Sequence, residues 1–335
     1  MTLMSAKLLV IATVLAATAF GQGKGMVVRC DRACLEAYVD KYLDAMVAHD
    51  PAQAPFARGV RFTENGQRLE PGDGLWNTMT GKGAYRLFVT DVEAQQVAFL
   101  GSIREANVGA MIGLRLKIRD NQITEAEHFV QRSPNSAAGF ERIGYQWTNV
   151  VPPAERMTRE ELVKTANLYF SGMQKNDGKG DYPFAPDCNR IENGALSTNQ
   201  PTKGGKQRPD PKTATMYSGE WSCMEQFKSG LIHFVTRIRD RRYVAVDPER
   251  GLVFAFGFFD HSAGDTRNYE TPDGRKVTAG PQQPWTWQIV ELFQLRKGQI
   301  HQIEAIMERS PYGMNAGWSS WEDGLSDRAR DVAKQ

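Results

Sequence analysis

Hydrophobic and polar residues alternate along eight segments of the chain, a pattern typical of β-strands with one buried face. The segments are residues 83–90, 95–105, 110–119 and 122–132, followed by 242–247, 251–260, 285–296 and 299–309. Residues 119–122 and 296–299 have turn compositions that predict tight hairpins between neighbouring strands. Because hairpins rather than helices join these strands, the pattern excludes a parallel-sheet dinucleotide-binding fold. No G-x-G-x-x-G or P-loop sequence follows a strand.

Two further segments, residues 31–49 and 157–175, have the periodicity of helices. Thr158 and Glu161 have the spacing of a capping box at the start of the second helix. Each helix is followed by a short predicted strand, which ends at Glu64 in one case and at Glu192 in the other. A helix followed by a curved antiparallel sheet predicts the α+β class.

The chain also contains an internal repeat. Glu127 aligns with Glu304 and Arg132 with Arg309, at a constant offset (304 − 127 = 177 and 309 − 132 = 177). Further matched blocks keep the same order: residues 41–46 with 168–173, 64–66 with 192–194, and 97–101 with 253–257. We interpret the chain as a tandem duplication with inserts near 195–215 and 262–284. The predicted parts are a first domain at 28–134, a linker at 135–156, a second domain at 157–311 and a C-terminal tail at 312–335.

The N-terminal segment has the pattern of a secretion signal. Lys7 precedes an apolar run from Leu8 to Phe20, about 13 residues, which is short for a membrane span but typical of a signal core. The small residues Ala19 and Gly21 suit cleavage after residue 21. We therefore predict that residues 1–21 are removed and that the protein is periplasmic or secreted, without a membrane contact. The alternative is an uncleaved anchor.

Export places the four cysteines in an oxidising compartment, where they can pair in three ways. Cys188 and Cys223 flank a polar insert, and Cys30 and Cys34 lie four residues apart near a predicted helix start. These two pairings are the ones we favour, and the other two connectivities stay open.

The charge balance and the motifs that are absent argue against several classes of function. The chain has 41 Lys and Arg against 39 Asp and Glu, and this net charge of +2 lacks the basic excess of a nucleic-acid-binding protein. HExxH, CxxC and G-x-S-x-G sequences are absent, so we expect neither a metal site nor an α/β-hydrolase. We expect no cofactor.

Each half resembles the NTF2-like, or SnoaL-like, superfamily, in which helices pack on a curved sheet to form a cone. The similarity rests on Tyr42-Leu43-Asp44-Ala45-Met46 in the first helix and on a Glu at the end of the first strand. It extends over nearly all of the chain after the signal, through loose motifs. It implies two tandem cones packed sheet to sheet as an intramolecular pseudo-dimer, with a homo-oligomer as an open alternative. Members of the superfamily include ketosteroid isomerase, dehydratases and non-catalytic binding domains, so the resemblance implies a pocket rather than a reaction.

The second half is similar to the ketosteroid-isomerase pattern at three positions. Tyr169 matches a helix tyrosine that donates to an oxyanion, Glu192 a base carboxylate, and Glu291 a protonated carboxyl on a later strand. The resemblance implies that these three residues are catalytic. Trp285 and Trp287 share the alternation of Glu291, and we expect them to form an aromatic wall that binds substrate.

The first half matches this pattern less completely. Tyr42 and Glu64 are similar to the tyrosine and the base, but Leu114 stands where the second half has Glu291. We expect Tyr42, Glu64 and His128 to contribute to substrate binding. The structural alternatives are that the tyrosine is a core residue and that Glu64-Asn65-Gly66 is only a turn.

The sequence therefore leads to an exported, cofactor-independent enzyme, an isomerase, dehydratase or other lyase, acting by proton transfer on a small hydrophobic or aromatic substrate. The alternatives are a non-catalytic small-molecule binding protein and an assembly module. Arg132 and Arg309 end matched strands, where we expect salt bridges with Glu127 and Glu304. Anchoring of a ligand carboxylate is the other interpretation.

Overall fold

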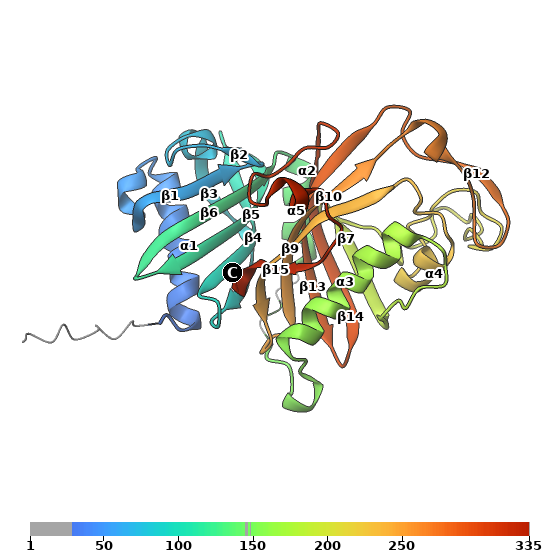
Figure 1. Cartoon of the computed structure of the whole chain (residues 1–335), viewed down its shortest axis with the longest axis horizontal. Coiled ribbons are helices and arrows are strands. Elements are labelled where there is room, and N and C mark those ends of the chain that lie inside the picture. Colours follow the sequence, from blue (N-terminus) through green and yellow to red (C-terminus); the bar gives the residue numbers. More distant parts are fainter. Residues whose placement is uncertain (1–28, 145–146, 148, 335) are drawn as a thin grey trace, which may run out of the picture.

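The computed structural model describes residues 29–144, 147 and 149–334, which form two halves side by side (Figure 1). Each half contains one long helix and one large curved sheet. The predicted signal segment, 1–21, lies outside the described residues. None of the helices in the described part of the chain combines the length and apolarity needed to cross a membrane.

The first half begins with helix α1 and continues into a six-stranded sheet. Its elements are α1 (Arg32–Val47), β1 (Phe56–Glu64), β2 (Gln67–Arg68), β3 (Met79–Asp91), β4 (Gln96–Glu105), β5 (Val108–Arg119) and β6 (Gln122–Gln131). The strand order is β2-β1-β6-β5-β4-β3, and the pairing of β1 with β6 is parallel. The other pairings in this sheet are antiparallel.

The second half repeats this arrangement with additions. Its elements are α3 (Arg159–Lys175), β7 (Phe184–Glu192), β8 (Ala195–Leu196), α4 (Cys223–Lys228), β9 (Arg237–Asp247), β10 (Leu252–His261), β11 (Asn268–Glu270), β12 (Lys276–Thr278), β13 (Trp285–Arg296), β14 (Gln299–Ser310) and β15 (Arg330–Asp331). The seven-stranded sheet has the order β15-β9-β10-β13-β14-β7-β8. Without β15, and read from β8 to β9, this order matches that of the first half. Helices beside two mainly antiparallel sheets confirm the predicted α+β class.

Local sequence signals account for the element boundaries. The side chains of Thr158 and Glu161 form the predicted capping box at the start of α3. Asp31 caps α1 by accepting a hydrogen bond from the Cys34 backbone N–H. The hairpins at 119–122 and 296–299 contain consecutive residues with positive φ, as tight hairpin turns require.

Each sheet has two buried faces. In β13, Ile289 and Phe293 pack toward α3, whereas Val290 and Leu292 belong to a core shared with the first sheet. Gly113 of the first sheet lies against Val290, and a Cβ there would approach a Val290 methyl carbon to 2.7 Å. The halves are thus joined face to face through their sheets, which is the packing expected from the sequence.

Two disulfides are present, Cys30–Cys34 and Cys188–Cys223, and the favoured pairing is confirmed. The second connects β7 to the first residue of α4 and anchors the base of the insert. Both bonds are consistent with a protein of the periplasm or the extracellular space.

The segment between the halves contains a helix that the sequence analysis missed. Helix α2 (Pro134–Ile143) packs on the first sheet through Ala137 and Phe140. The helix takes up residues 135–143 of the predicted linker, and Pro134 occupies its first turn, where proline is favoured. Gly139 meets Gly194 of the second half so closely that a Cβ would lie 2.2 Å from the Gly194 carbonyl oxygen.

The predicted C-terminal tail is instead a strap over both halves, which we define as residues 311–333. It contains α5 (Trp321–Gly324), and β15 pairs with β9. The Trp318 indole donates to Thr63 of the first sheet at 2.8 Å. Gln96, also in the first sheet, donates to the Ala333 carbonyl at 3.1 Å.

Candidate functional site

The second half brings Tyr169, Glu192 and Glu291 to the inner face of its sheet. Glu192 on β7 and Glu291 on β13 both pair in register with Ala305 of the intervening strand β14. Paired residues share a face, and Ala305 belongs to the core beneath α3, which also contains Tyr169. We call Tyr169, Arg190, Glu192 and Glu291 the second-half site.

Glu291 is a buried carboxyl that lies beside the Tyr169 hydroxyl. It is 1% exposed, and neither carboxyl oxygen has a hydrogen-bond partner of ordinary geometry among the described residues. Burial raises the pKa of Glu291 to about 8, and the negative charge of Glu192 adds to the effect, while Arg190 and Tyr169 oppose it. At neutral pH this carboxyl therefore carries a proton and can donate a hydrogen bond.

Tyr169 is a second neutral donor beside it. Its hydroxyl is buried and also lacks a partner of ordinary geometry within the described part of the chain. Burial raises the pKa of Tyr169 well above its usual value, partly opposed by the Arg190 charge, and Glu291 contributes to the rise. The Arg190 guanidinium carbon lies 5.5 Å from the centroid of the tyrosine ring.

Glu192 is the carboxylate of the site that reaches solvent. Its side chain is 27% exposed and forms an ion pair with buried Arg190. Arg190 is held in turn by Gln226 at 2.7 Å and by the Tyr217 hydroxyl at 2.9 Å. The sequence analysis missed Arg190, although it lies two residues before Glu192 and so faces the same side of β7.

An aromatic cluster lies on the same face of the sheet, at the start of β13. It consists of Phe234, His261, Trp285 and Trp287. The His261 ring stacks on Trp285 at 3.9 Å between centroids and meets Trp287 edge-on at 4.7 Å. The two predicted tryptophans are therefore adjacent, and each is half-buried. His261, which the sequence analysis left unassigned, is 1% exposed.

The residues predicted for the first half, Tyr42, Glu64 and His128, also lie close together, but there they contact one another. The Tyr42 hydroxyl lies 2.6 Å from His128 Nε2, and His128 Nδ1 lies 3.8 Å from Glu64 Oε2. Glu64 accepts hydrogen bonds from the Leu75 N–H at 2.8 Å and from Arg132 at 3.0 Å. Burial alone would raise the pKa of Glu64, but His128, the Leu75 N–H and Arg132 together lower it to about 2.

The repeated Glu-Asn-Gly sequence has a structural role in both halves. Asn65 and Asn193 adopt positive φ values of 47° and 48°. The Asn65 side chain accepts from the Val130 N–H and donates to the Val130 carbonyl, and Asn193 does the same with Met307. The match between the halves at this motif therefore reflects a shared turn that is tied to the neighbouring strand.

The expected salt bridges of Arg132 and Arg309 with Glu127 and Glu304 do not form. Glu127 pairs with Arg242 across the interface between the halves, and Glu304 accepts a hydrogen bond from Tyr85. The expectation was wrong because residues five apart on a strand point to opposite faces. Both glutamates face the other sheet, whereas the two arginines lie on the inner faces.

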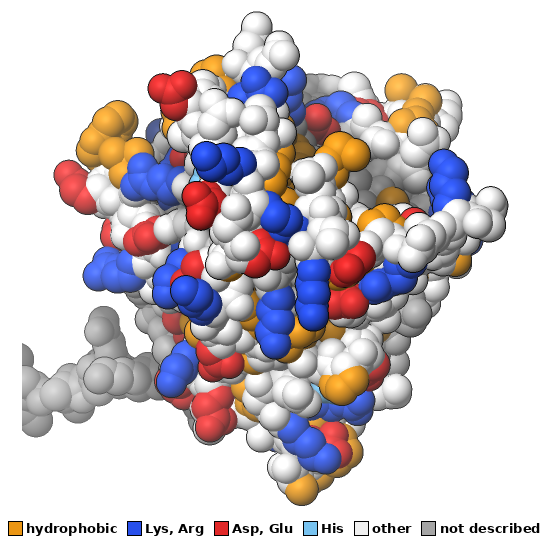
Figure 2. Space-filling view, turned by 90° about the vertical axis from the view of Figure 1, so that its right-hand side faces the viewer, with side chains coloured by type: hydrophobic (Ala, Val, Ile, Leu, Met, Phe, Trp, Pro, Cys, Tyr) orange, Lys and Arg blue, Asp and Glu red, His pale blue; other side chains and the backbone are white. Residues whose placement is uncertain are grey.

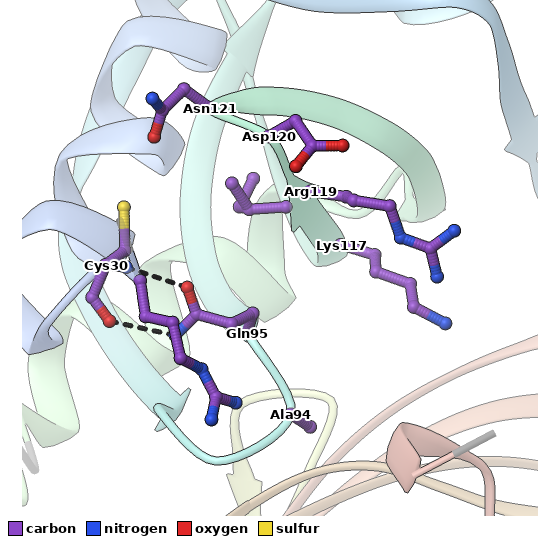
Figure 3. A pocket seen from close by; sticks show the side chains of 9 residues that line it. Cys30, Ala94, Gln95, Lys117, Arg119, Asp120 and Asn121 are labelled. Atoms are coloured by element: carbon purple, nitrogen blue, oxygen red, sulfur yellow. Dashed lines mark hydrogen bonds between the residues drawn. The ribbon is translucent and has the colours of Figure 1, made fainter. Parts of the chain in front are cut away.

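Two surface cavities lie away from the second-half site. One, of about 290 Å³, is bounded by the β5–β6 turn and by Gln95, which bonds both backbone groups of Cys30 (Figure 3). The other, of about 720 Å³, lies beneath the insert. Figure 2 shows the insert end of the molecule, where acidic and basic side chains intermingle and the surface is hollowed. Tyr169, Glu192 and Glu291 line neither cavity, and of the three only Glu192 is partly exposed.

In the described ranges, no three or more His, Cys, Asp or Glu side chains gather as metal ligands would. The fold and site thus define an α+β protein of two similar curved-sheet halves, one of which contains unpartnered buried donors. The chain belongs to the family described as a domain of unknown function, DUF8021, which matches residues 28–130 and 155–307. The two matched segments coincide with the two halves.

No curated protein matches the chain. Among solved structures, a de novo designed protein with a curved β-sheet is similar over 45% of this chain and 88% of its own, at 18% identity and a TM-score of 0.23.

Proposed function

We propose that the chain is a pair of tandem NTF2-like cones and that the second cone is a proton-transfer enzyme, an isomerase, dehydratase or other lyase. The observation that supports the activity most directly is the pair of neutral, unpartnered donors, Tyr169 and Glu291, beside the carboxylate of Glu192. The shared strand order of the two sheets, each with a helix on its inner face, supports the duplicated cone.

In this proposal the substrate is a small hydrophobic or aromatic carbonyl compound. Its carbonyl oxygen accepts hydrogen bonds from Tyr169 and Glu291, and Glu192 removes a proton from the adjacent carbon. The C–H electron pair then forms an enolate whose negative oxygen the two donors stabilise. Return of the proton to another carbon completes an isomerisation. Transfer of the proton to a departing hydroxyl group releases water and completes a dehydration.

In this proposal, access to the site depends on two aromatic side chains that cover Arg190. Tyr217, whose hydroxyl binds Arg190, lies 6.1 Å from Phe234 between ring centroids, and both residues pack on the second-half core. Movement of these two side chains would open a path past Trp287 to the partly exposed Glu192. The substrate would then replace protein contacts around the two donors.

A second candidate is a binding protein without catalysis. The Arg190–Glu192 ion pair supports it, because a carboxylate that is already engaged by a buried guanidinium would have to leave it before it could reach a substrate carbon. The same donors would then hold a carbonyl or phenolic oxygen without any proton leaving carbon.

Proton exchange in D₂O separates these candidates without knowledge of the natural substrate. The disulfide-intact protein would be incubated with a panel of aryl and alkyl ketones, and loss of the α-C–H signals followed by NMR. We expect catalysed exchange for at least one ketone, reduced about 100-fold or more by Glu192→Gln. Exposed Glu270 provides the control variant Glu270→Gln, which should leave exchange unchanged. Binding of ketones without any catalysed exchange would favour the binding protein.

A further inference from the structure

The two matched arginines, Arg132 and Arg309, differ in their partners. In the first half, Arg132 forms two hydrogen bonds with Glu105, at 2.7 and 3.0 Å, and one with Glu64 at 3.0 Å. Two carboxylates of the chain therefore balance this guanidinium at the open end of the first sheet.

The second half has lost both of these contacts. His261 occupies the position of Glu105, because the same offset relates it to Glu105 and relates Gly257 to Gly101 (261 − 105 = 156 and 257 − 101 = 156). The pairings agree, since Glu105 and His261 each lie opposite the first residue of the next strand, Val108 or Trp285. Glu192 occupies the position of Glu64, but it binds Arg190 instead of Arg309.

Arg309 is consequently an exposed cation on the inner face with no ion pair and no side-chain hydrogen bond within the described ranges. Its guanidinium carbon lies 5.1 Å from the centroid of Trp285. Glu308 is adjacent in sequence, but its carboxylate accepts the Arg309 backbone N–H.

Nor does His261 supply a compensating charge. Neither ring nitrogen makes a hydrogen bond of ordinary geometry within the described residues, and burial lowers the pKa of His261 to about 4, with Arg309 contributing, so the ring is neutral above that pH. An anion is therefore missing from the place that Glu105 fills in the first half.

We propose that the ligand of the second-half site is an elongated aromatic carboxylate, whose carboxylate binds Arg309 as Glu105 binds Arg132. Its ring lies against Trp285 and Trp287, and its carbonyl oxygen reaches Tyr169 and Glu291. Arg309 pairs with Trp287 in register, and Trp287 lies four residues from Glu291, about 13 Å along the strand. A keto acid with a ring between its two polar ends spans most of this distance, and the long Arg309 side chain covers the rest. The inference rests on the proposed function, because it places the reacting carbonyl at the two donors.

Matched acids and amides test the carboxylate contact directly. Binding of 4-(4-acetylphenyl)butanoate, a keto acid with its ring between the two polar ends, and of its primary amide would be followed by quenching of tryptophan fluorescence. We expect the acid to bind about tenfold more tightly than the amide, the strength of a partly exposed charge-assisted hydrogen bond. Arg309→Gln should remove this preference, and Arg309→Lys should keep part of it. The control variant Arg296→Gln, at an exposed arginine of β13, should leave it intact.

His261→Glu provides a second, independent variant. It restores the carboxylate that the first half has, so it should neutralise Arg309 and abolish the preference while the arginine is still present. Circular dichroism would check that each variant folds. Equal affinity of acid and amide in the unmodified protein, binding of neither, or a preference that survives Arg309→Gln would each overturn the inference.

A different result would overturn the proposed function itself, rather than the carboxylate contact. If Tyr169→Phe and Glu291→Gln change neither proton exchange nor affinity for the amide, the two donors have no role, whatever the acid preference shows. If they do change exchange while Arg309→Gln leaves the acid preference intact, only the carboxylate contact is wrong.

Discussion

Each half places an ionisable residue at the same level of its own sheet, but the two residues lie on different strands. In the first half His128 stands opposite Leu114, and in the second Ala305 stands opposite Glu291. His128 binds the Tyr42 hydroxyl, whereas Glu291 and its neighbour Tyr169 have no hydrogen-bond partner of ordinary geometry in the described residues. An unpartnered buried polar group costs stability. The difference suggests that the first half has become a structural support and that the second retains its polar groups for a ligand.

The largest expected effect comes from giving the second half the residue that the first half has. Glu291→Leu should reduce proton exchange about 100-fold or more, because one of the two oxyanion donors is lost. The same variant should be more stable by about 1 to 3 kcal/mol at neutral pH, because a buried polar group without a partner is replaced by an apolar one. NMR exchange and urea denaturation would measure the two effects. A variant that is both active and less stable would contradict the comparison.

The pH dependence of stability should differ between the halves. Glu291 has a raised pKa of about 8 in the folded state against 4.5 as its ordinary value, so the folded protein holds a proton that the unfolded chain releases. Glu291 should therefore make the free energy of unfolding fall as pH rises from about 4.5 to 8, by up to roughly 1.4 kcal/mol per pH unit. Glu304, whose pKa is raised to about 7, adds a fall in the same direction. The difference between urea-denaturation profiles of the unmodified protein and Glu291→Leu isolates Glu291, and parallel profiles would refute the assignment.

Glu64 should behave in the opposite way and with a smaller effect. Its folded pKa is lowered to about 2, so its contribution is present above about pH 4.5 and is lost as pH falls toward 2. Glu64→Gln should cost about 1 kcal/mol at neutral pH, because the neutral amide keeps a hydrogen-bond acceptor but loses the charge that Arg132 and His128 face. Denaturation at pH 7 and pH 3 would show this loss shrinking with acid. A loss that is equal at both values would mean that the charge is unimportant.

The parts of the fold that depend on neighbouring residues could be predicted from the sequence. β1 and β7 end at Glu64 and Glu192 as expected, and simple alternation placed Glu291 on the inner face. Contacts between distant segments could not be predicted. The partner of Arg132 is Glu105 of another strand, and the isolation of Arg309 depends on which strand lies beside Trp285. The strap has no periodic pattern, because scattered residues such as Trp318 hold it in place.

Because the strap is C-terminal, it is synthesised after the strands that it covers. Residues 311–333 follow both sheets in the chain, so a chain emerging from the ribosome or crossing a membrane N-terminus first has made both sheets before β15 exists. Until then β9 is an uncovered edge whose backbone groups can pair with another strand, including one from a second copy. Synthesis that stalls before residue 311 would therefore yield chains prone to associate, and rapid completion or a chaperone bound at that edge would protect them.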